Sequence, residues 1–125
     1  HDRGVFGVAQ CGHPDSRLLA MDLATLQTEL RQFAIDRRWP PFHTPKNLAM
    51  ALMVEAAELA EIFQWMTPEE SVVASLDPAT KDHIGDEVAD VLLYLVQLAD
   101  HTGIDIEAAV ARKRDKNTRK YPKPD

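Results

Sequence analysis

Apolar side chains recur every three or four residues along most of the chain after residue 20, which is the spacing of one face of an α-helix. The first such stretch begins at Leu23 and predicts a helix to about Arg38. Further helices are predicted over about 45–65, 79–100 and 106–116, with a short one over about 68–76. Because no stretch alternates like a strand, the pattern predicts an all-α, four-helix-bundle-like fold with four main helices and a short extra helix.

Residues suited to helix ends stand at the boundaries of these stretches. Gly103 follows the third long stretch, where a glycine can adopt the left-handed conformation that ends a helix. Glu70 stands three residues after a threonine, which is the spacing of a capping box. Side chains that can cap a helix N-terminus precede all five predicted helices: Asp22, Thr44, Thr67, Asp77 and Asp105.

The apolar face of the second long helix is interrupted by acidic residues. Each helical residue advances about 100° around the axis, which places Glu55 in the middle of an apolar stripe that includes Leu48 and Ile62. Glu58 lies about 60° to one side. A carboxylate that points into a helix interface is costly unless it is paired or binds a cation.

The third long helix repeats this arrangement. Glu87 is surrounded on its helix face by apolar residues that include Ile84 and Val91, and Asp90 lies about 60° away. If the two faces pack together, four carboxylates meet, and their mutual repulsion raises their pKa values unless a cation is present. Oxygen ligands suit a hard divalent cation, so the pattern predicts a Mg²⁺ site, with Mn²⁺ as the alternative, formed by Glu55, Glu58, Glu87 and Asp90.

Composition and charge narrow the class of protein. The chain has 125 residues, a hydrophobic fraction of 45% and a net charge of −6, which predict one globular domain and argue against nucleic acid or an anionic membrane as a partner. The single cysteine, Cys11, cannot form an intrachain disulfide, and no apolar run has the length of a membrane span. We therefore expect a cytoplasmic protein.

The domain boundaries follow from the same pattern. Residues 1–20 lack helical periodicity and are either a native N-terminal extension or a segment from an expression vector, with Met21 as the native start. We expect one helical domain over 21–116, which the resemblance below identifies as catalytic. Residues 117–125 form a basic, proline-containing tail.

Four sequence blocks in one order resemble a known family. FHTPKN precedes the first acid pair, EAAELAEIFQW contains it, DEVADVLLYLVQLA contains the second pair after 28 intervening residues, and KRDKNTRKYP follows. Acid pairs alone are common on solvated helices, but the whole series resembles the MazG-like all-α nucleotide pyrophosphohydrolases, and within them the dCTP pyrophosphatase branch. The resemblance covers roughly residues 21–122 and implies a MazG-type fold.

The resemblance also implies an activity and a set of site residues. It implies a magnesium-dependent hydrolase that cuts a nucleoside triphosphate between its α and β phosphates, acting on dCTP or a modified dCTP in nucleotide-pool clean-up. The metal ligands of the family fall on the same four carboxylates. The family residues that hold the triphosphate fall on Lys113, Asn117 and Tyr121, which could otherwise be a basic last turn that favours the helix dipole.

Several further residues are weaker candidates. Glu61 is either a solvated carboxylate or an additional ligand or base. The remaining substrate-binding candidates lie at helix ends or beside the acid pairs: Trp39, His43, Lys46, Asn47, Trp65 and Tyr94. Core packing is the alternative for the two tryptophans, and a structural role is the alternative for the histidine.

The sequence allows alternatives for the nucleobase of the substrate, for the class of protein and for the oligomeric state. The base could be that of dUTP or another non-canonical nucleotide, because Leu30 and Gln32 stand where relatives of the dCTP branch can carry a polar residue near the base. The chain could also be a non-catalytic helical interaction module with solvated acid pairs. The resemblance implies a homo-oligomer with a pocket shared between copies, and we expect a tetramer before a dimer.

Overall fold

The computed structural model describes residues 21–125, so the segment predicted as an extension or a vector-derived sequence lies outside the described residues. Four α-helices and two 3₁₀ turns follow one another, with no β-strand between residues 21 and 125. The predicted all-α fold with four main helices is confirmed. The elements are α2 (Leu23–Asp36), η2 (Pro40–Phe42), α3 (Pro45–Phe63), η3 (Val73–Ser75), α4 (Pro78–Thr102) and α5 (Ile106–Lys120).

The helices begin where the capping residues predict. In each case a side-chain oxygen of the N-cap residue accepts a hydrogen bond from a backbone N–H in the first turn, which satisfies one of the free donors there. These N-caps are Asp22, Thr44, Asp77 and Asp105. At the other end of α4, Gly103 has φ 69°, and the N–H of Ile104 donates to the carbonyl of Ala99 at 2.9 Å. This left-handed glycine ends α4 and turns the chain toward α5.

The predicted short helix over 68–76 is wrong. Thr67 and Glu70 do form a capping box, with the N–H of Thr67 donating to Glu70 at 2.8 Å, but only turns follow it. Val72 has φ −73° and ψ 150°, an extended conformation that interrupts the segment and leaves only η3. Two adjacent β-branched residues, Val72 and Val73, favour that extended conformation over a helix.

The other boundaries differ by a few residues. α2 and α3 each end about two residues before the predicted position, whereas α5 continues to Lys120 and includes the first four residues of the predicted tail. Every helix between residues 21 and 125 is too short or too polar to serve as a membrane span.

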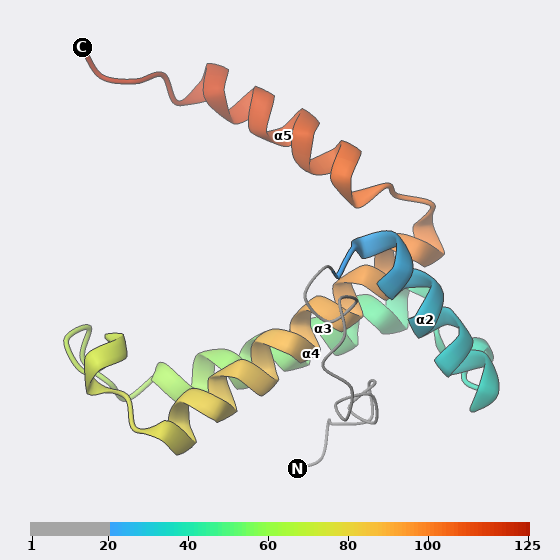
Figure 1. The fold of residues 1–125 in the computed structure, drawn as a ribbon, viewed down its shortest axis with the longest axis horizontal. Coiled ribbons are helices and arrows are strands. Elements are labelled where there is room, and N and C mark those ends of the chain that lie inside the picture. The colour runs from blue at the N-terminus through green and yellow to red at the C-terminus, as the bar shows by residue number, and fades with distance from the viewer. Residues whose placement is uncertain (1–20) are drawn as a thin grey trace.

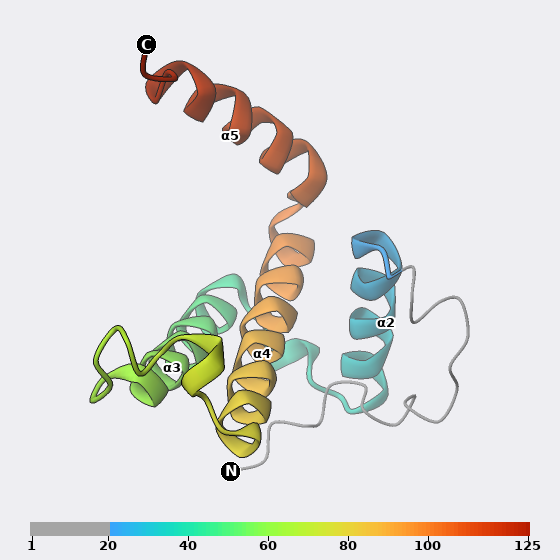
Figure 2. The ribbon, with the colours of Figure 1, turned by 60° about the vertical axis from the view of Figure 1, so that its left-hand side comes forward.

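Helix α4 is the centre of the arrangement. α3 packs antiparallel along one side of it, and α2 packs on the opposite side near its C-terminal end (Figures 1 and 2). α5 projects away from these three helices (Figure 1), and none of its side chains is buried against the rest of residues 21–125. The acid-bearing helices α3 and α4 therefore form the main interface of the chain.

The apolar core is small. Leu48 and Val96 are fully buried, and Leu30, Ala34 and Ala99 complete the buried apolar set of the described chain. Many large apolar side chains are exposed instead, among them Met50, Met53 and Val54 on α3 and Val88 and Leu95 on α4. An exposed apolar surface of this kind is typical of a chain that associates with another protein surface.

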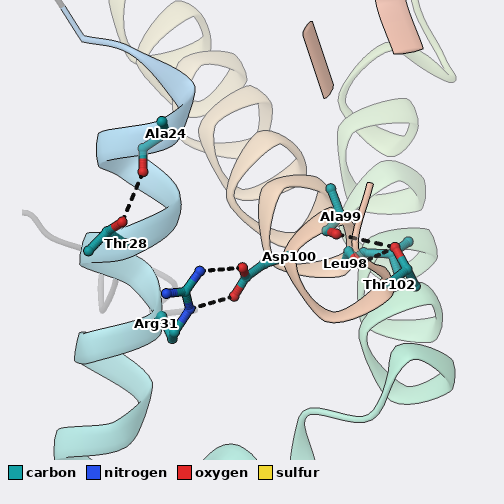
Figure 3. Close-up of polar contacts among 7 residues, drawn as sticks. All are labelled: Ala24, Thr28, Arg31, Leu98, Ala99, Asp100 and Thr102. Atoms are coloured by element: carbon teal, nitrogen blue, oxygen red, sulfur yellow. Dashed lines mark hydrogen bonds and ion pairs between the residues drawn. The ribbon is translucent and has the colours of Figure 1, made fainter. Parts of the chain in front are cut away.

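A two-pronged ion pair joins α2 to α4. The Nε and Nη2 atoms of Arg31 donate to the two carboxylate oxygens of Asp100 at 3.0 and 2.6 Å (Figure 3). These hydrogen bonds hold the pKa of Asp100 below its usual value of 3.8. Fork geometry gives such a pair both strength and direction, so it fixes how α2 lies on α4.

We expect Arg31→Met to lower the thermal midpoint of unfolding at pH 7. Because Arg31 lowers the folded-state pKa of Asp100, the pair stabilises the folded chain above pH 3.8, and this contribution is lost as the pH falls through the lowered pKa. The stability difference from wild type should therefore shrink below pH 3.8 in urea titrations. Arg112→Met, on the exposed surface of α5, is the matched control. A difference that stays constant from pH 7 to pH 3 would contradict this role.

Candidate functional site

Four carboxylates line the interface of α3 and α4, as the helical spacing predicts. α3 carries Glu55 and Glu58 on adjacent turns of one face, and α4 carries Glu87 and Asp90 in the same way. Glu55, Glu87 and Asp90 are 2%, 3% and 4% exposed, while Glu58 is half-buried. Acidic side chains are almost never buried to this extent unless they are paired or bind a cation.

Three of these carboxylates come close together. Glu55, Glu58 and Glu87 each offer one oxygen, and these oxygens lie within 4.8 Å of one another. Asp90 is buried one turn further along α4 and lies outside this compact group. The structure thus brings together three of the four predicted ligands and places the fourth on the same helix face.

Among the four carboxylates, Glu87 has a clearly raised pKa. Burial raises the pKa of Glu87, and hydrogen bonding and charge from Glu55, followed by the charge of Glu58, raise it further, while His83 lowers it. The Oε2 atom of Glu87 is buried and has no hydrogen-bond partner among the described residues. A buried carboxylate oxygen of this kind is costly in the protein alone, so the site is suited to a positive ligand.

The donor set fits a hard divalent cation. All ligand atoms of the compact group are carboxylate oxygens, which Mg²⁺ and Mn²⁺ accept readily and which softer metals do not select. A cation would supply the positive charge that the group lacks and a partner for the free oxygen of Glu87. The acidic cluster can therefore bind a metal ion, and Glu55, Glu58 and Glu87 are the residues that would hold it.

A cavity of about 550 Å³ opens beside the acidic cluster. It lies between the C-terminal end of α3 and the first turns of α4, and Glu58 and Glu87 from the cluster form part of its wall. The volume is in the range of small-molecule sites. The other lining residues are Glu61, Ile62, Gln64, Met66, Thr80 and His83.

Glu61, a weaker candidate from the sequence, and His83, which was not a candidate, both line this cavity. Glu61 is exposed at the cavity wall, in agreement with a solvated carboxylate. His83 is absent from the residues predicted from sequence, although its position four residues before Glu87 places it on the same helix face. That spacing is the signal that could have identified it.

Trp39 and His43 lie beyond the N-terminal end of α3, away from the cavity at its C-terminal end. The ring of Trp39 packs edge-on to Phe33, at 5.7 Å between centroids, and lies 5.8 Å from the ring of His43. His43 in turn lies 6.2 Å from His101 on α4. Burial, followed by the charge of His101, lowers the pKa of His43. Within one chain these two candidates form an aromatic cluster that joins α2 to α4.

The candidates at the start of α3 are exposed. Asn47 has a local role, because its side-chain amide donates to the carbonyl of Phe42 at 3.1 Å and its backbone N–H donates to Thr44 at 3.2 Å. Lys46 is exposed on the same turn. These contacts fix the entry of the chain into α3.

Trp65 and Tyr94 lie nearer the acidic cluster. Trp65 follows the end of α3 between two residues that line the cavity, and it is 88% exposed. An indole with this exposure offers a flat apolar face to a ligand or to another chain. Tyr94 is half-buried on α4, one turn beyond Asp90.

The structure does not bring the basic candidates of α5 to the acidic cluster of the same chain. Lys113 and Asn117 lie on α5, which projects away from α3 and α4, and Tyr121 directly follows that helix (Figure 1). Lys113 is exposed, and Tyr121 is 68% exposed. If these residues contact a ligand at the cluster, they reach it from another copy of the chain.

Comparison with known proteins connects this geometry to characterised relatives. A sequence model of the MazG-like family matches residues 50–125. The chain is 44% identical over 91 residues to human dCTP pyrophosphatase 1 and 43% identical to the bovine protein of that name, covering 73% of this chain and 54% of each relative. The chain therefore spans about half the length of the curated relatives it matches.

A solved structure also matches. A pyrophosphatase from Archaeoglobus fulgidus superposes with a TM-score of 0.74 at 44% sequence identity. The match covers 81% of this chain and 93% of the archaeal protein. The helical arrangement described above is thus one that a solved pyrophosphatase also has.

We expect Mg²⁺ to stabilise the protein through the acidic cluster. At a Mg²⁺ concentration of about 100 times its Kd, the free energy of unfolding should rise by about 2.7 kcal/mol, measured by thermal or urea denaturation. Glu87→Gln should lose this increase. In EDTA the same variant should be at least as stable as wild type, because it removes one of the crowded carboxylates.

Asp86→Asn is the matched control for this experiment. Asp86 is adjacent to Glu87 on α4 but exposed, so its variant should keep the full response to Mg²⁺. An equal response in both variants would show that the cation does not bind at the cluster.

Proposed function

Because the chain belongs to the MazG-like family, we propose that it is a magnesium-dependent nucleoside triphosphate pyrophosphohydrolase. It would cut its substrate between the α and β phosphates and release a nucleoside monophosphate and pyrophosphate. The observation that carries this proposal is the burial of Glu55 and Glu87, at 2% and 3% exposure, against each other in the main helix interface. A non-catalytic helix interface would have no reason to bury these charges.

Glu55, Glu58 and Glu87 are proposed to hold the cation, with Asp90 as the fourth ligand from the next turn of α4. The support is the compact oxygen group of the first three and the 4% exposure of Asp90. When bound, Mg²⁺ would neutralise charge on the phosphate oxygens and would activate the water molecule that attacks the phosphorus.

The chemical step requires few groups from the protein. A water oxygen bonds to the α-phosphorus, the bond from that phosphorus to the bridging oxygen breaks, and pyrophosphate leaves. A carboxylate of the cluster accepts the proton that the water loses. Because a carboxylate of the cluster can act as the general base, the reaction does not require a histidine or lysine for this role.

The triphosphate also needs cationic partners. We propose that Lys113, Asn117 and Tyr121 contact its phosphates, supported by the basic composition of the second half of α5. Because α5 projects away from the cluster of its own chain, these residues would act on the cluster of a neighbouring copy.

An oligomer follows from this arrangement, and we propose a homotetramer before a dimer. The exposed apolar residues of α3 and α4 support association, since a single chain leaves them in water. The acidic net charge of −6 supports the absence of nucleic acid and membrane partners, and we propose a cytoplasmic location.

We propose that the preferred substrate is dCTP or a modified dCTP. The support is the similarity of the chain to human and bovine dCTP pyrophosphatase 1, at 44% and 43% identity. Trp65 is the proposed stacking surface because it is exposed beside the cavity, with Trp39 and His43 as contacts from a second element or copy. Lys46 and Asn47 are proposed as contacts to phosphate or water, and Tyr94 as a contact to sugar or phosphate.

Pyrophosphate release from a panel of nucleoside triphosphates tests the function. The panel holds ribo and deoxy forms of all bases and 5-methyl-dCTP, each with Mg²⁺ and with EDTA. We expect Mg²⁺-dependent release, fastest with dCTP or 5-methyl-dCTP. Glu55→Gln and Asp90→Asn should lower the rate by about 10³-fold or more while far-UV circular dichroism stays unchanged. Asp82→Asn, an exposed acid of α4, is the control.

Other outcomes of the panel decide between the alternatives. A profile led by dUTP or another non-canonical nucleotide would keep the reaction and reject dCTP as the preferred substrate. No release from any substrate, together with no stabilisation by Mg²⁺, would indicate a non-catalytic helical interaction module.

Lys113→Ala tests the role of α5. We expect it to weaken binding of a triphosphate more than binding of the matching monophosphate, because the lysine is proposed to contact the outer phosphates. Calorimetric titration with a non-hydrolysable triphosphate and with the monophosphate measures both affinities. An equal effect on the two ligands would remove Lys113 from the phosphate site.

Subunit mixing extends this prediction to the oligomer. If Glu55 and Lys113 of one site come from different copies, a mixed oligomer of Glu55→Gln and Lys113→Ala chains contains some intact sites. Its activity should then exceed the sum of the two variants measured separately. If both residues of a site come from the same copy, mixing produces no gain.

A further inference from the structure

His83 occupies the wall of the cavity next to the acidic cluster. It lies on α4 one turn before Glu87, so the two side chains share a face of the helix. Its Nε2 atom is 3.8 Å from the Oε1 atom of Glu87. The imidazole is 59% exposed and the Glu87 side chain only 4% exposed. His83 therefore connects the open cavity to a buried carboxylate.

The two oxygens of Glu87 have different surroundings. Oε1 is the atom that His83 approaches, whereas Oε2 is buried and has no hydrogen-bond partner among the described residues. A carboxylate that binds a cation through one oxygen is commonly oriented by a hydrogen-bond donor on the other. In Glu87, Oε1 can accept from His83 and Oε2 can bind the cation, which would replace the hydrogen bonding between Glu55 and Glu87.

The stability of α4 alone does not account for this pair. Oppositely charged residues four apart stabilise a helix best when the acid comes first in the chain, and here the histidine comes first. The pair also joins a largely exposed side chain to a buried one, whereas an ordinary surface pair joins two exposed side chains. A role at the site explains the arrangement better than a role in the helix.

We propose that His83 is a positioning residue for Glu87. Its Nε2 atom lies 3.8 Å from Oε1 in this structure, and in the cation-bound site its Nε2–H donates to Oε1 while Oε2 faces the cation. This inference rests on the proposed function and adds to it a residue outside the four carboxylates. The imidazole can donate from Nε2 in its neutral form as well as in its charged form, so the contact does not require His83 to titrate.

The test is a calorimetric titration of Mg²⁺ into the metal-free protein, without nucleotide, for wild type and three variants. His83→Leu removes the donor, and we expect it to raise the Kd for Mg²⁺ by about 10–100-fold. His83→Gln keeps an N–H donor of similar reach and should stay within about threefold of wild type. Lys81→Leu removes an exposed positive charge two residues away and should also stay near wild type.

A kinetic measurement separates positioning from a general loss of structure. His83→Leu should raise the Mg²⁺ concentration that gives half-maximal pyrophosphate release, while kcat at saturating Mg²⁺ stays close to wild type. The thermal midpoint in EDTA should change little, because an ion pair of 3.8 Å with a largely exposed imidazole contributes little to the free energy of unfolding.

Four results would overturn the inference. They are wild-type affinity in His83→Leu, equally poor affinity in His83→Gln and His83→Leu, an equal loss in Lys81→Leu, and a wild-type protein that does not bind Mg²⁺. Only the last of these also removes the proposed function, so the failure of the inference and the failure of the function can be told apart.

Discussion

The burial of acidic side chains between α3 and α4 is the constraint on which the rest of the structure depends. Glu55 and Glu87 take up positions that apolar residues would otherwise fill, and the raised pKa of Glu87 follows from burial and from its acidic neighbours. Like charges in a poorly hydrated interface need a positive partner. The main helix interface of this chain is therefore also its candidate ligand site, and under the proposed function the same residues determine both stability and activity.

The other helices are organised around that interface in different ways. The forked ion pair of Arg31 with Asp100 fixes α2 at the C-terminal end of α4, away from the acidic cluster. Gly103 then directs α5 away from the packed helices, so the basic residues of α5 and the acidic cluster lie apart within one chain. An exposed basic helix and an acidic cavity in the same molecule carry opposite charges, which is why we propose that the site is completed by a second copy.

Much of the fold could be predicted from sequence because it depends on local signals. Helical periodicity and N-cap residues located α2, α3, α4 and α5 to within a few residues, and the family predicted from four sequence blocks is confirmed. The prediction of a short helix over 68–76 was wrong because Val72 adopts an extended backbone, which the preceding capping box does not prevent. Helix geometry identified the buried Glu55 and Glu87, but the exclusion of Asp90 from the compact group depends on how α3 and α4 meet. The direction of α5 and the cavity beside His83 are likewise tertiary features that spacing does not determine.

The most direct measurement is the position of a bound cation in a crystal. Mn²⁺ accepts the same oxygen ligands as Mg²⁺ and can be located by its anomalous scattering. Crystals grown with Mn²⁺ should show an anomalous peak within bonding distance of Glu55, Glu58 and Glu87, and the same map would decide whether Asp90 is the fourth ligand. A well-ordered α3–α4 interface with no peak at these carboxylates would contradict the account, because the buried acids would then be stable without a cation.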